Sequence, residues 1–75
     1  MNPYSTKQGA FVYDEEQDRI DIRFGLDSYY GCLHCGETMD VFIDSEWIPT
    51  RIEKACDWYL VGIKAASLPG LLVRK

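Results

Sequence analysis

Apolar and charged residues alternate strictly along one short segment of this chain, and that pattern is the strongest constraint on its fold. In residues 19–24 every second position is isoleucine or phenylalanine, and the positions between are arginine or aspartate. Successive side chains of a strand point to opposite faces, so the pattern predicts a β-strand with one charged face in water. Residues 10–13 are aromatic and β-branched and predict its partner strand. The acidic run 14–18 between them then forms a solvent-exposed hairpin loop.

A second hairpin is predicted from residues 38–43 and 46–53. Met39, Val41 and Ile43 share one face of the first segment, and Ile48, Thr50 and Ile52 share one face of the second. The two faces match when residues 44–45 form a two-residue turn. This register places Phe42 opposite Trp47 on the face directed away from the core. The turn sequence Asp-Ser is a weaker hairpin signal than Asn-Gly, so a longer loop with a bulge is the alternative.

Residues 52–66 are consistent with two patterns. Their apolar residues form a helical stripe, but residues 58–63 are rich in aromatic and β-branched types and contain a glycine. We therefore expect a strand there, after a turn at 54–57, and a long helix over 52–66 would overturn the β interpretation. Residues 67–70 predict a tight turn or one turn of 3₁₀-helix before a closing strand at 71–74.

These elements together predict an all-β fold, a small antiparallel barrel of about five to six strands with a short 3₁₀ turn before the last strand. Such a turn is similar to that of SH3-like barrels, an analogy that does not fix function. Residues 1–8 are polar and aperiodic and are expected to form a flexible N-terminal arm before a single domain over residues 9–75. A chain of 75 residues has little material for a catalytic cleft beyond its core.

Charge and cysteine content narrow the function classes. The formal net charge of -4 repels nucleic-acid phosphates unless the basic residues are segregated, which favours a protein partner or a small ligand. No apolar run reaches the roughly 18 residues of a membrane span, and residues 1–8 lack the apolar core of a signal peptide. An odd number of cysteines fits a reducing compartment, so we expect a cytoplasmic protein with free thiols.

Three parts of the sequence carry a resemblance to a known family. They are Asp18–Asp27 with Tyr29–Gly31 and Leu33–Glu37, then Trp47–Glu53, then Asp57–Gly62. In these parts the chain resembles a family of small bacterial proteins known only as a domain of unknown function and found in Gram-positive genomes, often on mobile elements. The resemblance implies no activity or cofactor, and the family pattern has glycine where this chain has Cys32. A mobile-element context implies, as one alternative, an inhibitor of a host defence protein, and the acidic charge suits a basic protein surface.

Cys32, His34 and Cys35 lie within four residues, and Cys56 follows downstream, so the chain holds four ligand types that zinc accepts. Structural zinc sites usually take paired ligands from two arms, whereas here three share one arm. We therefore expect no metal and no cofactor, with a zinc or thiol site at Cys32, His34 and Cys35 as an alternative. A Cys35 nucleophile activated by His34 would lack a group to orient the imidazole, so the chain is not expected to be an enzyme.

The segment 25–36 is predicted to be a long loop that carries Tyr29 and Tyr30. Loops of about twelve residues are uncommon in compact domains and are often binding loops. The alternative is that the two tyrosines cap one end of the core. The outward pair Phe42 and Trp47 is the second candidate contact surface, because large exposed aromatic side chains usually mark one.

The outward aromatic pair would be extended by Trp58 or Tyr59, unless residues 1–8 or the long loop cover it. The sequence thus predicts a small non-enzymatic module that binds another protein or forms a homodimer. Its expected binding residues are Tyr29, Tyr30, His34, Phe42, Trp47, Arg51 and Trp58. The alternative is a small barrel that contacts nucleic acid through Arg19, Arg23, Arg51 and Arg74.

Overall fold

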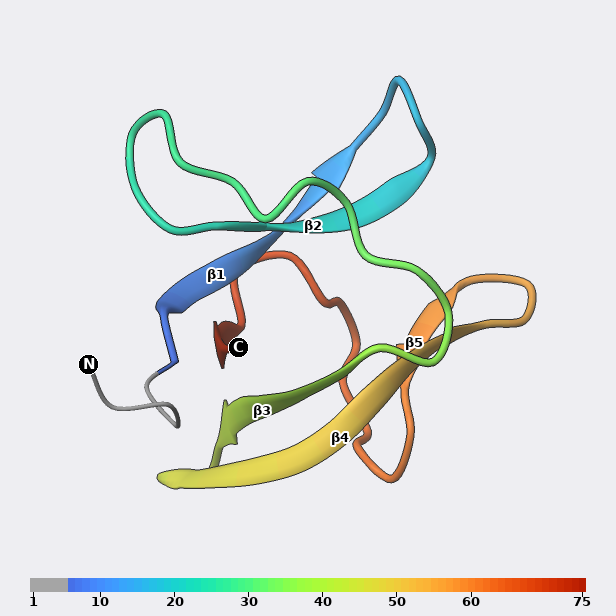
Figure 1. Cartoon of the computed structure of the whole chain (residues 1–75). Coiled ribbons are helices and arrows are strands. Elements are labelled where there is room, and N and C mark those ends of the chain that lie inside the picture. The colour runs from blue at the N-terminus through green and yellow to red at the C-terminus, as the bar shows by residue number, and fades with distance from the viewer. Residues whose placement is uncertain (1–5) are drawn as a thin grey trace.

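The computed structural model describes residues 6–75, which form one sheet of six antiparallel strands (Figure 1). The strands are β1 (Gln8–Asp14), β2 (Arg19–Arg23), β3 (Thr38–Ile43), β4 (Glu46–Lys54), β5 (Trp58–Leu60) and β6 (Leu72–Arg74). Their order across the sheet is β2-β1-β6-β3-β4-β5, so the last strand of the chain lies between β1 and β3. The described residues contain no helix, and the predicted all-β class with six strands is confirmed.

The β3–β4 hairpin has the register predicted from the alternating pattern. Phe42 lies opposite Trp47, and the strands are joined by the two residues Asp44 and Ser45. Their φ angles of 49° and 65° are those of a type I′ turn, whose twist matches that of the flanking strands. The structure therefore has the predicted two-residue turn, and the strand pairing continues without a bulge.

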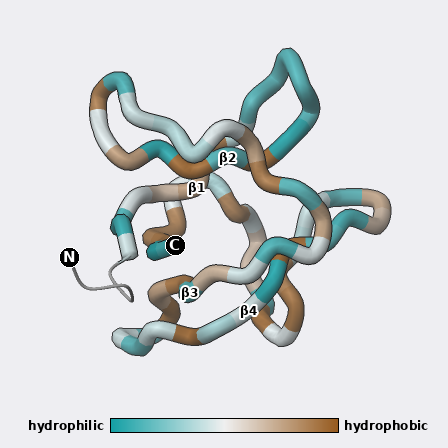
Figure 2. The backbone as a smooth tube through the Cα atoms, in the orientation of Figure 1, coloured by the Kyte–Doolittle hydropathy of each residue, from teal (hydrophilic) through white to brown (hydrophobic). Residues whose placement is uncertain are grey.

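The β1–β2 hairpin is also confirmed, and its acidic loop is exposed. Figure 2 shows the hydrophilic tip of this hairpin standing away from the rest of the chain. Gly9 packs tightly against β2, because a Cβ atom there would come within 2.4 Å of the backbone oxygen of Arg23. A side chain at this position would push β2 away from β1.

The prediction of a closed barrel is wrong, because the two end strands β2 and β5 are not paired with each other. β5 has only three residues and turns away at once, so it offers too short an edge for closure. The loop 25–36 covers the outer edge of β2 instead, with the Leu33 N–H donating to the Ile20 carbonyl at 2.8 Å (Figure 1). At the other end, the indole N–H of Trp58 donates to the Asp18 carbonyl at 3.1 Å. Loop and side chains thus bridge the open side.

The C-terminal third is irregular but not helical. Residues 52–66 hold the end of β4, a bend and β5, so the helical alternative is wrong. Before β6, the Leu71 N–H donates to the Leu68 carbonyl at 3.1 Å, and Gly70 has a φ of 95°. These values describe a β-turn with Pro69 and Gly70 at its centre, in place of the expected 3₁₀ turn. The SH3-like assignment stays a prediction.

The core lies on the concave side of the sheet. It comprises Phe11, Ile20, Ile22, Leu33, Met39, Val41, Ile52, Leu60, Leu68 and Val73. The prediction that the charged face of β2 lies in water is wrong at Asp21, which is only 7% exposed. The reason is long-range, because the loop 25–36 folds over the outward face of β2 and its backbone contacts this carboxylate.

The predicted N-terminal arm falls partly outside the described residues, which begin at Thr6. Within them, Gln8 opens β1, and the backbone groups of Lys7 and Lys75 exchange two hydrogen bonds of 3.1 and 3.0 Å. Residues 7 and 8 therefore extend the sheet beside the C-terminus. In residues 6–75 there is no helix of the length and apolarity that a membrane crossing requires.

Candidate functional site

A patch of aromatic and charged side chains, some exposed and some half-buried, covers the outward side of three neighbouring strands. We call it the outer face, and it comprises Asp40, Phe42, Trp47, Pro49, Arg51 and Arg74. These residues share one side because side chains alternate along each strand, while Met39, Val41 and Val73 between them enter the core. The outer face therefore follows directly from the register of β3, β4 and β6.

Trp47 lies near the centre of the outer face, between two partners. The Phe42 and Trp47 rings have centroids 5.1 Å apart at a tilt of 55°, a favourable aromatic geometry. Arg74 extends from β6 across β3, and its guanidinium lies 4.4 Å from the centroid of the Trp47 ring on β4. Its Nε also donates to the Asp40 carboxylate at 3.1 Å. Arg74 thus covers part of Trp47, while Phe42 remains 37% exposed.

A shallow groove of about 630 Å³ runs beside this stack, and Pro49, Arg51, Arg74 and Lys75 are among its lining residues. Pro49 lies opposite Asp40, which is a non-hydrogen-bonded pair in a hairpin of this register. Although proline has no N–H, Pro49 therefore costs no hydrogen bond between β3 and β4. Its ring instead disfavours the pairing of a further strand with the outer edge of β4. Arg51 extends from the same edge and forms an ion pair with Glu53 at 3.0 Å.

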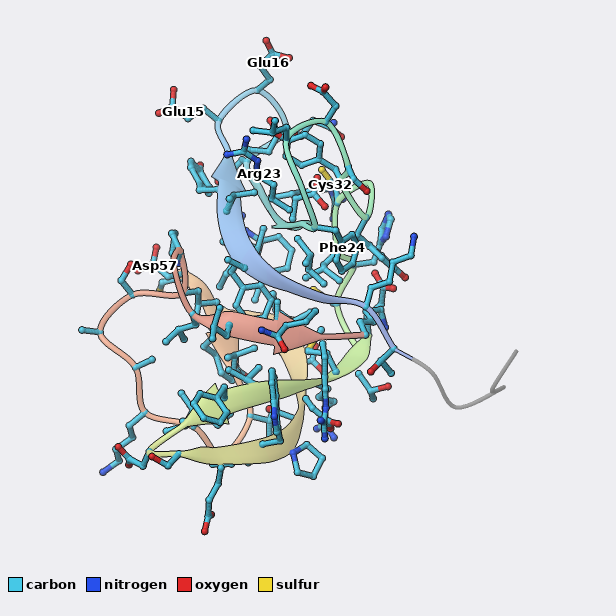
Figure 3. All side chains as sticks on the ribbon, turned by 90° about the vertical axis from the view of Figure 1, so that its left-hand side faces the viewer. Glu15, Glu16, Arg23, Phe24, Cys32 and Asp57 are labelled. Atoms are coloured by element: carbon cyan, nitrogen blue, oxygen red, sulfur yellow. The ribbon has the colours of Figure 1, made fainter. Side chains whose placement is uncertain are left out.

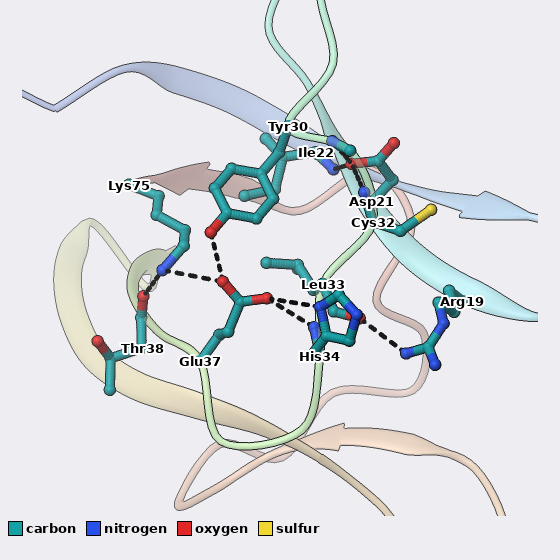
Figure 4. A network of polar contacts seen from close by, with 11 residues as sticks. Arg19, Asp21, Ile22, Tyr30, Cys32, Leu33, His34, Glu37, Thr38 and Lys75 are labelled. Atoms are coloured by element: carbon teal, nitrogen blue, oxygen red, sulfur yellow. Dashed lines mark hydrogen bonds and ion pairs between the residues drawn. The ribbon is translucent and has the colours of Figure 1, made fainter.

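Tyr30 and His34 meet around Glu37, close to Lys75 (Figure 4). The Tyr30 hydroxyl and the His34 backbone N–H both donate to the Glu37 carboxylate, the latter at 2.6 Å. Lys75 Nζ donates to the Thr38 carbonyl at 2.6 Å and lies 5.3 Å from the centroid of the Tyr30 ring. Lys75 therefore joins this cluster to the groove that it also lines.

The carboxylate of Glu37 is stabilised in its charged form. Its partial burial acts to raise its pKa, but the hydrogen bonds from Tyr30 and His34 and the ammonium of Lys75 together hold that pKa below its ordinary value. The hydrogen bond to Glu37 in turn raises the pKa of Tyr30. Both shifts favour the arrangement seen here, with a neutral tyrosine donating to an ionised carboxylate.

Tyr29 and Trp58 do not join the outer face. Tyr29 forms an isolated bridge with Arg23 on the far side of the loop, so the two adjacent tyrosines serve different surfaces. Trp58 lies opposite Lys54 and packs against the rim of the core. It is held there by its bond to Asp18 and by the Lys54 ammonium, 5.2 Å from its ring centroid. Tyr59 points outward beside Glu53.

The four arginines considered for nucleic-acid contact are distributed over several strands, and each has an internal partner. Arg19 donates to the Leu33 carbonyl at 3.3 Å, and Arg23 donates to the Gly25 carbonyl at 2.9 Å. Arg51 and Arg74 form the ion pairs described above. They do not form a continuous basic stripe of the kind that follows a phosphate backbone.

The cysteines and His34 are not gathered around one point. Within residues 6–75 no group of three or more His, Cys, Asp or Glu side chains is placed to hold a metal ion. Cys32 is buried, whereas Cys35 and Cys56 are exposed. Burial, with a hydrogen bond to Asp14, raises the pKa of the Cys32 thiol, which keeps it protonated and unreactive.

The backbone at Cys32 has a φ of 71°, a conformation that favours glycine. The glycine that the resemblance implies at this position therefore has a physical reason. A cysteine at this position is accommodated with local backbone strain.

Two residues of the outer face were not predicted as binding residues. Arg74 was considered only for nucleic acid, and Asp40 not at all, because their meeting depends on β6 inserting beside β3. Glu37 was likewise missed. The available signal was a pair of oppositely charged residues on neighbouring strands, but sequence spacing does not show which strands are neighbours.

Comparisons with known proteins place this chain in a family without assigning an activity. A family model described as a domain of unknown function, DUF5348, matches residues 9–75. A crystal structure of a protein from Ruminococcus gnavus has 52% sequence identity and a TM-score of 0.88, covering 92% of this chain and 100% of that one. No curated protein matches the chain.

Proposed function

We propose that this chain, which belongs to the DUF5348 family, is a non-enzymatic module that binds another protein through its outer face. The observation that carries the proposal is the stack of Phe42, Trp47 and Arg74 at the surface. Tryptophan, tyrosine and arginine are the residue types most enriched at the centres of protein interfaces. A partner that covers Phe42 and Trp47 would remove their exposed apolar area from water at about 25 cal/mol per Å².

The stack is already organised before a partner arrives. Arg74 is held by Asp40 at 3.1 Å and by its position over Trp47, so little side-chain freedom remains to be lost on binding. Binding is tighter when contact residues are ordered in advance, since less conformational entropy is lost in the complex. An interface role thus accounts for the arrangement better than a purely structural one, because the core lies on the opposite side of the sheet.

The cluster around Glu37 supplies the rim of the proposed interface. Tyr30 is 42% exposed and His34 is exposed, and both are fixed by hydrogen bonds to one carboxylate. A polar, hydrogen-bonding rim around an apolar centre is the usual anatomy of such a surface. Arg51, which also lines the groove, offers a charged group to the same partner.

We favour a different protein over a second copy of this chain. Two copies would each bring a net charge of -4, so self-association would work against charge repulsion. A basic partner would be attracted instead. The three free cysteines are consistent with a cytoplasmic setting for this interaction.

The proposal is tested by affinity capture from cells that encode the chain. Wild type, the double variant Trp47→Ala with Tyr30→Ala, and the single variant Tyr13→Ala serve as baits. Tyr13 is an exposed aromatic residue outside the outer face, so its variant is the matched control. We expect one protein captured by wild type and by the control but lost with the double variant. Equal capture by all three folded baits would refute the proposal, as would a stable homodimer of wild type that needs Trp47.

A further inference from the structure

A second surface feature lies away from the outer face, between the β1–β2 hairpin and the loop 25–36. It is a cavity of about 580 Å³, which we call the hairpin cavity. The residues relevant to its chemistry are Asp14, Glu15, Asp21, Arg23, Tyr29 and Cys32. In Figure 3, Glu15 lies at the hairpin tip, with Arg23 and Cys32 below it.

Asp21 is the buried group of this cavity, and only one of its two oxygens is used. Oδ1 accepts backbone hydrogen bonds from Ile22 at 2.7 Å, Gly31 at 3.0 Å and Cys32 at 2.9 Å. Figure 4 shows these bonds meeting at one oxygen while the other points away. Asp21 is only 7% exposed, and among the described residues no donor reaches its Oδ2. No enclosed side-chain oxygen there lacks a partner, so Oδ2 is accessible from the cavity that Asp21 lines. A carboxylate so placed has acceptor capacity to spare inside the cavity.

The other charges around the cavity do not neutralise Asp21. The guanidinium of Arg23 is directed at the loop, where it donates to the carbonyls of Gly25 at 2.9 Å and Leu26 at 3.3 Å. No ion pair joins Arg23 to Asp21 in the part of the chain described here. Asp14 accepts hydrogen bonds within the hairpin turn, and Glu15 stands at the rim. The lining therefore has an excess of negative charge.

We propose that the hairpin cavity receives a single organic cation, the guanidinium or ammonium group of a basic side chain. Oδ2 of Asp21 accepts its N–H bonds, and Glu15 adds attraction at the entrance. The ring of Tyr29, which is 52% exposed at the cavity wall, offers a face for a cation–π contact. A metal ion fits less well, because the described acidic side chains do not converge on one point.

This inference does not depend on the outer face. A protein partner that uses the outer face need not reach the hairpin cavity, and a basic side chain can enter the cavity without touching Trp47. The two proposals therefore fail separately.

The test is an NMR titration of the whole chain with N-acetyl-arginine amide and N-acetyl-lysine amide. The neutral isostere N-acetyl-citrulline amide is the control ligand. We expect saturable shifts of the Ile22, Gly31 and Cys32 amide signals with one or both cationic probes, in the millimolar range, and none with citrulline. Either cationic probe supports the proposal, and their ratio distinguishes guanidinium from ammonium.

The variant Asp21→Asn keeps an oxygen for the three backbone donors but replaces the second carboxylate oxygen by an amide. It should weaken binding roughly tenfold, as loss of a charged partner does. Asp27→Asn removes the same charge from the exposed part of the loop and should leave binding unchanged. If Asp21→Asn does not fold, Tyr29→Ala replaces it and should weaken binding roughly threefold through the lost cation–π contact. Absence of saturable shifts, equal binding of citrulline, or unchanged binding by the folded variants would overturn the proposal.

Discussion

Replacing Asp21 by alanine removes the one acceptor that fastens the loop 25–36 onto β2. Three backbone N–H groups then lose their partner, those of Ile22, Gly31 and Cys32. Gly31 is exposed, so water can replace its bond, whereas Ile22 and Cys32 are buried. Each buried donor left unsatisfied costs about 1–3 kcal/mol, so with two of them Asp21→Ala should lower the free energy of unfolding by roughly 2–6 kcal/mol. That is a large share of the roughly 4–11 kcal/mol expected for a domain of this size.

The companion variant Asp21→Asn separates the acceptor from the charge. Its side-chain oxygen can still receive the three N–H bonds, but neutral hydrogen bonds are about half as strong as charge-assisted ones. We therefore expect a loss of only about 1–2 kcal/mol. Urea denaturation followed by tryptophan fluorescence measures both values, with Asp27→Asn as the exposed control. Equal losses for the alanine and asparagine variants, or a loss below about 1 kcal/mol for alanine, would refute the anchoring role of Asp21.

Three further predictions concern the loop and its neighbours. In urea denaturation, Cys32→Gly should change the free energy of unfolding by less than about 1 kcal/mol, because glycine relieves the strain of the positive φ and this offsets the lost side chain. Cys32→Val should lower the free energy of unfolding by more than about 1 kcal/mol, because a branched side chain adopts a positive φ poorly. The pKa of Glu37 lies below its ordinary value of 4.5 in the folded chain, so its contribution to stability is present above that pH and is lost as the pH falls through the folded-state pKa. Wild type should accordingly exceed Glu37→Gln in stability at neutral pH and lose that advantage in acid, and a pH-independent difference would contradict this. Iodoacetamide should modify the exposed Cys35 and Cys56 well before the buried Cys32, as mass spectrometry of timed samples can show, and equal rates would contradict the raised pKa of Cys32.

The pairing of strands within each hairpin was predictable because it depends on residues that are close together in the sequence. The register of β3 on β4, with Phe42 opposite Trp47, follows from alternation and a two-residue turn, and the structure has it as predicted. The same holds for the β1–β2 hairpin. The strand expected at residues 58–63 was correct for Trp58–Leu60, since aromatic and β-branched residues outweighed the helical stripe, but the chain turns at residues 61–62.

The features that depend on distant contacts were not predictable from the sequence pattern. Asp21 looks like a surface residue in its strand, and only the loop that folds over β2 buries it. Barrel closure failed for a similar reason, because the length of β5 and the path of the loop decide whether the end strands meet. The outer face was half predicted, with its aromatic pair expected and Arg74 missed, since the position of β6 beside β3 is a property of the whole topology.

The most direct measurement of the binding proposal is site-specific photo-cross-linking in cells that encode the chain. Benzoylphenylalanine is incorporated at position 42 on the outer face, or at position 26 in the exposed part of the loop as the control, because Leu26 is 82% exposed and lines neither the groove nor the hairpin cavity. Irradiation followed by mass spectrometry should give one discrete adduct with a different protein from position 42 and none from position 26. No adduct at position 42, the same adducts at both positions, or an adduct only with a second copy of the chain would contradict the account.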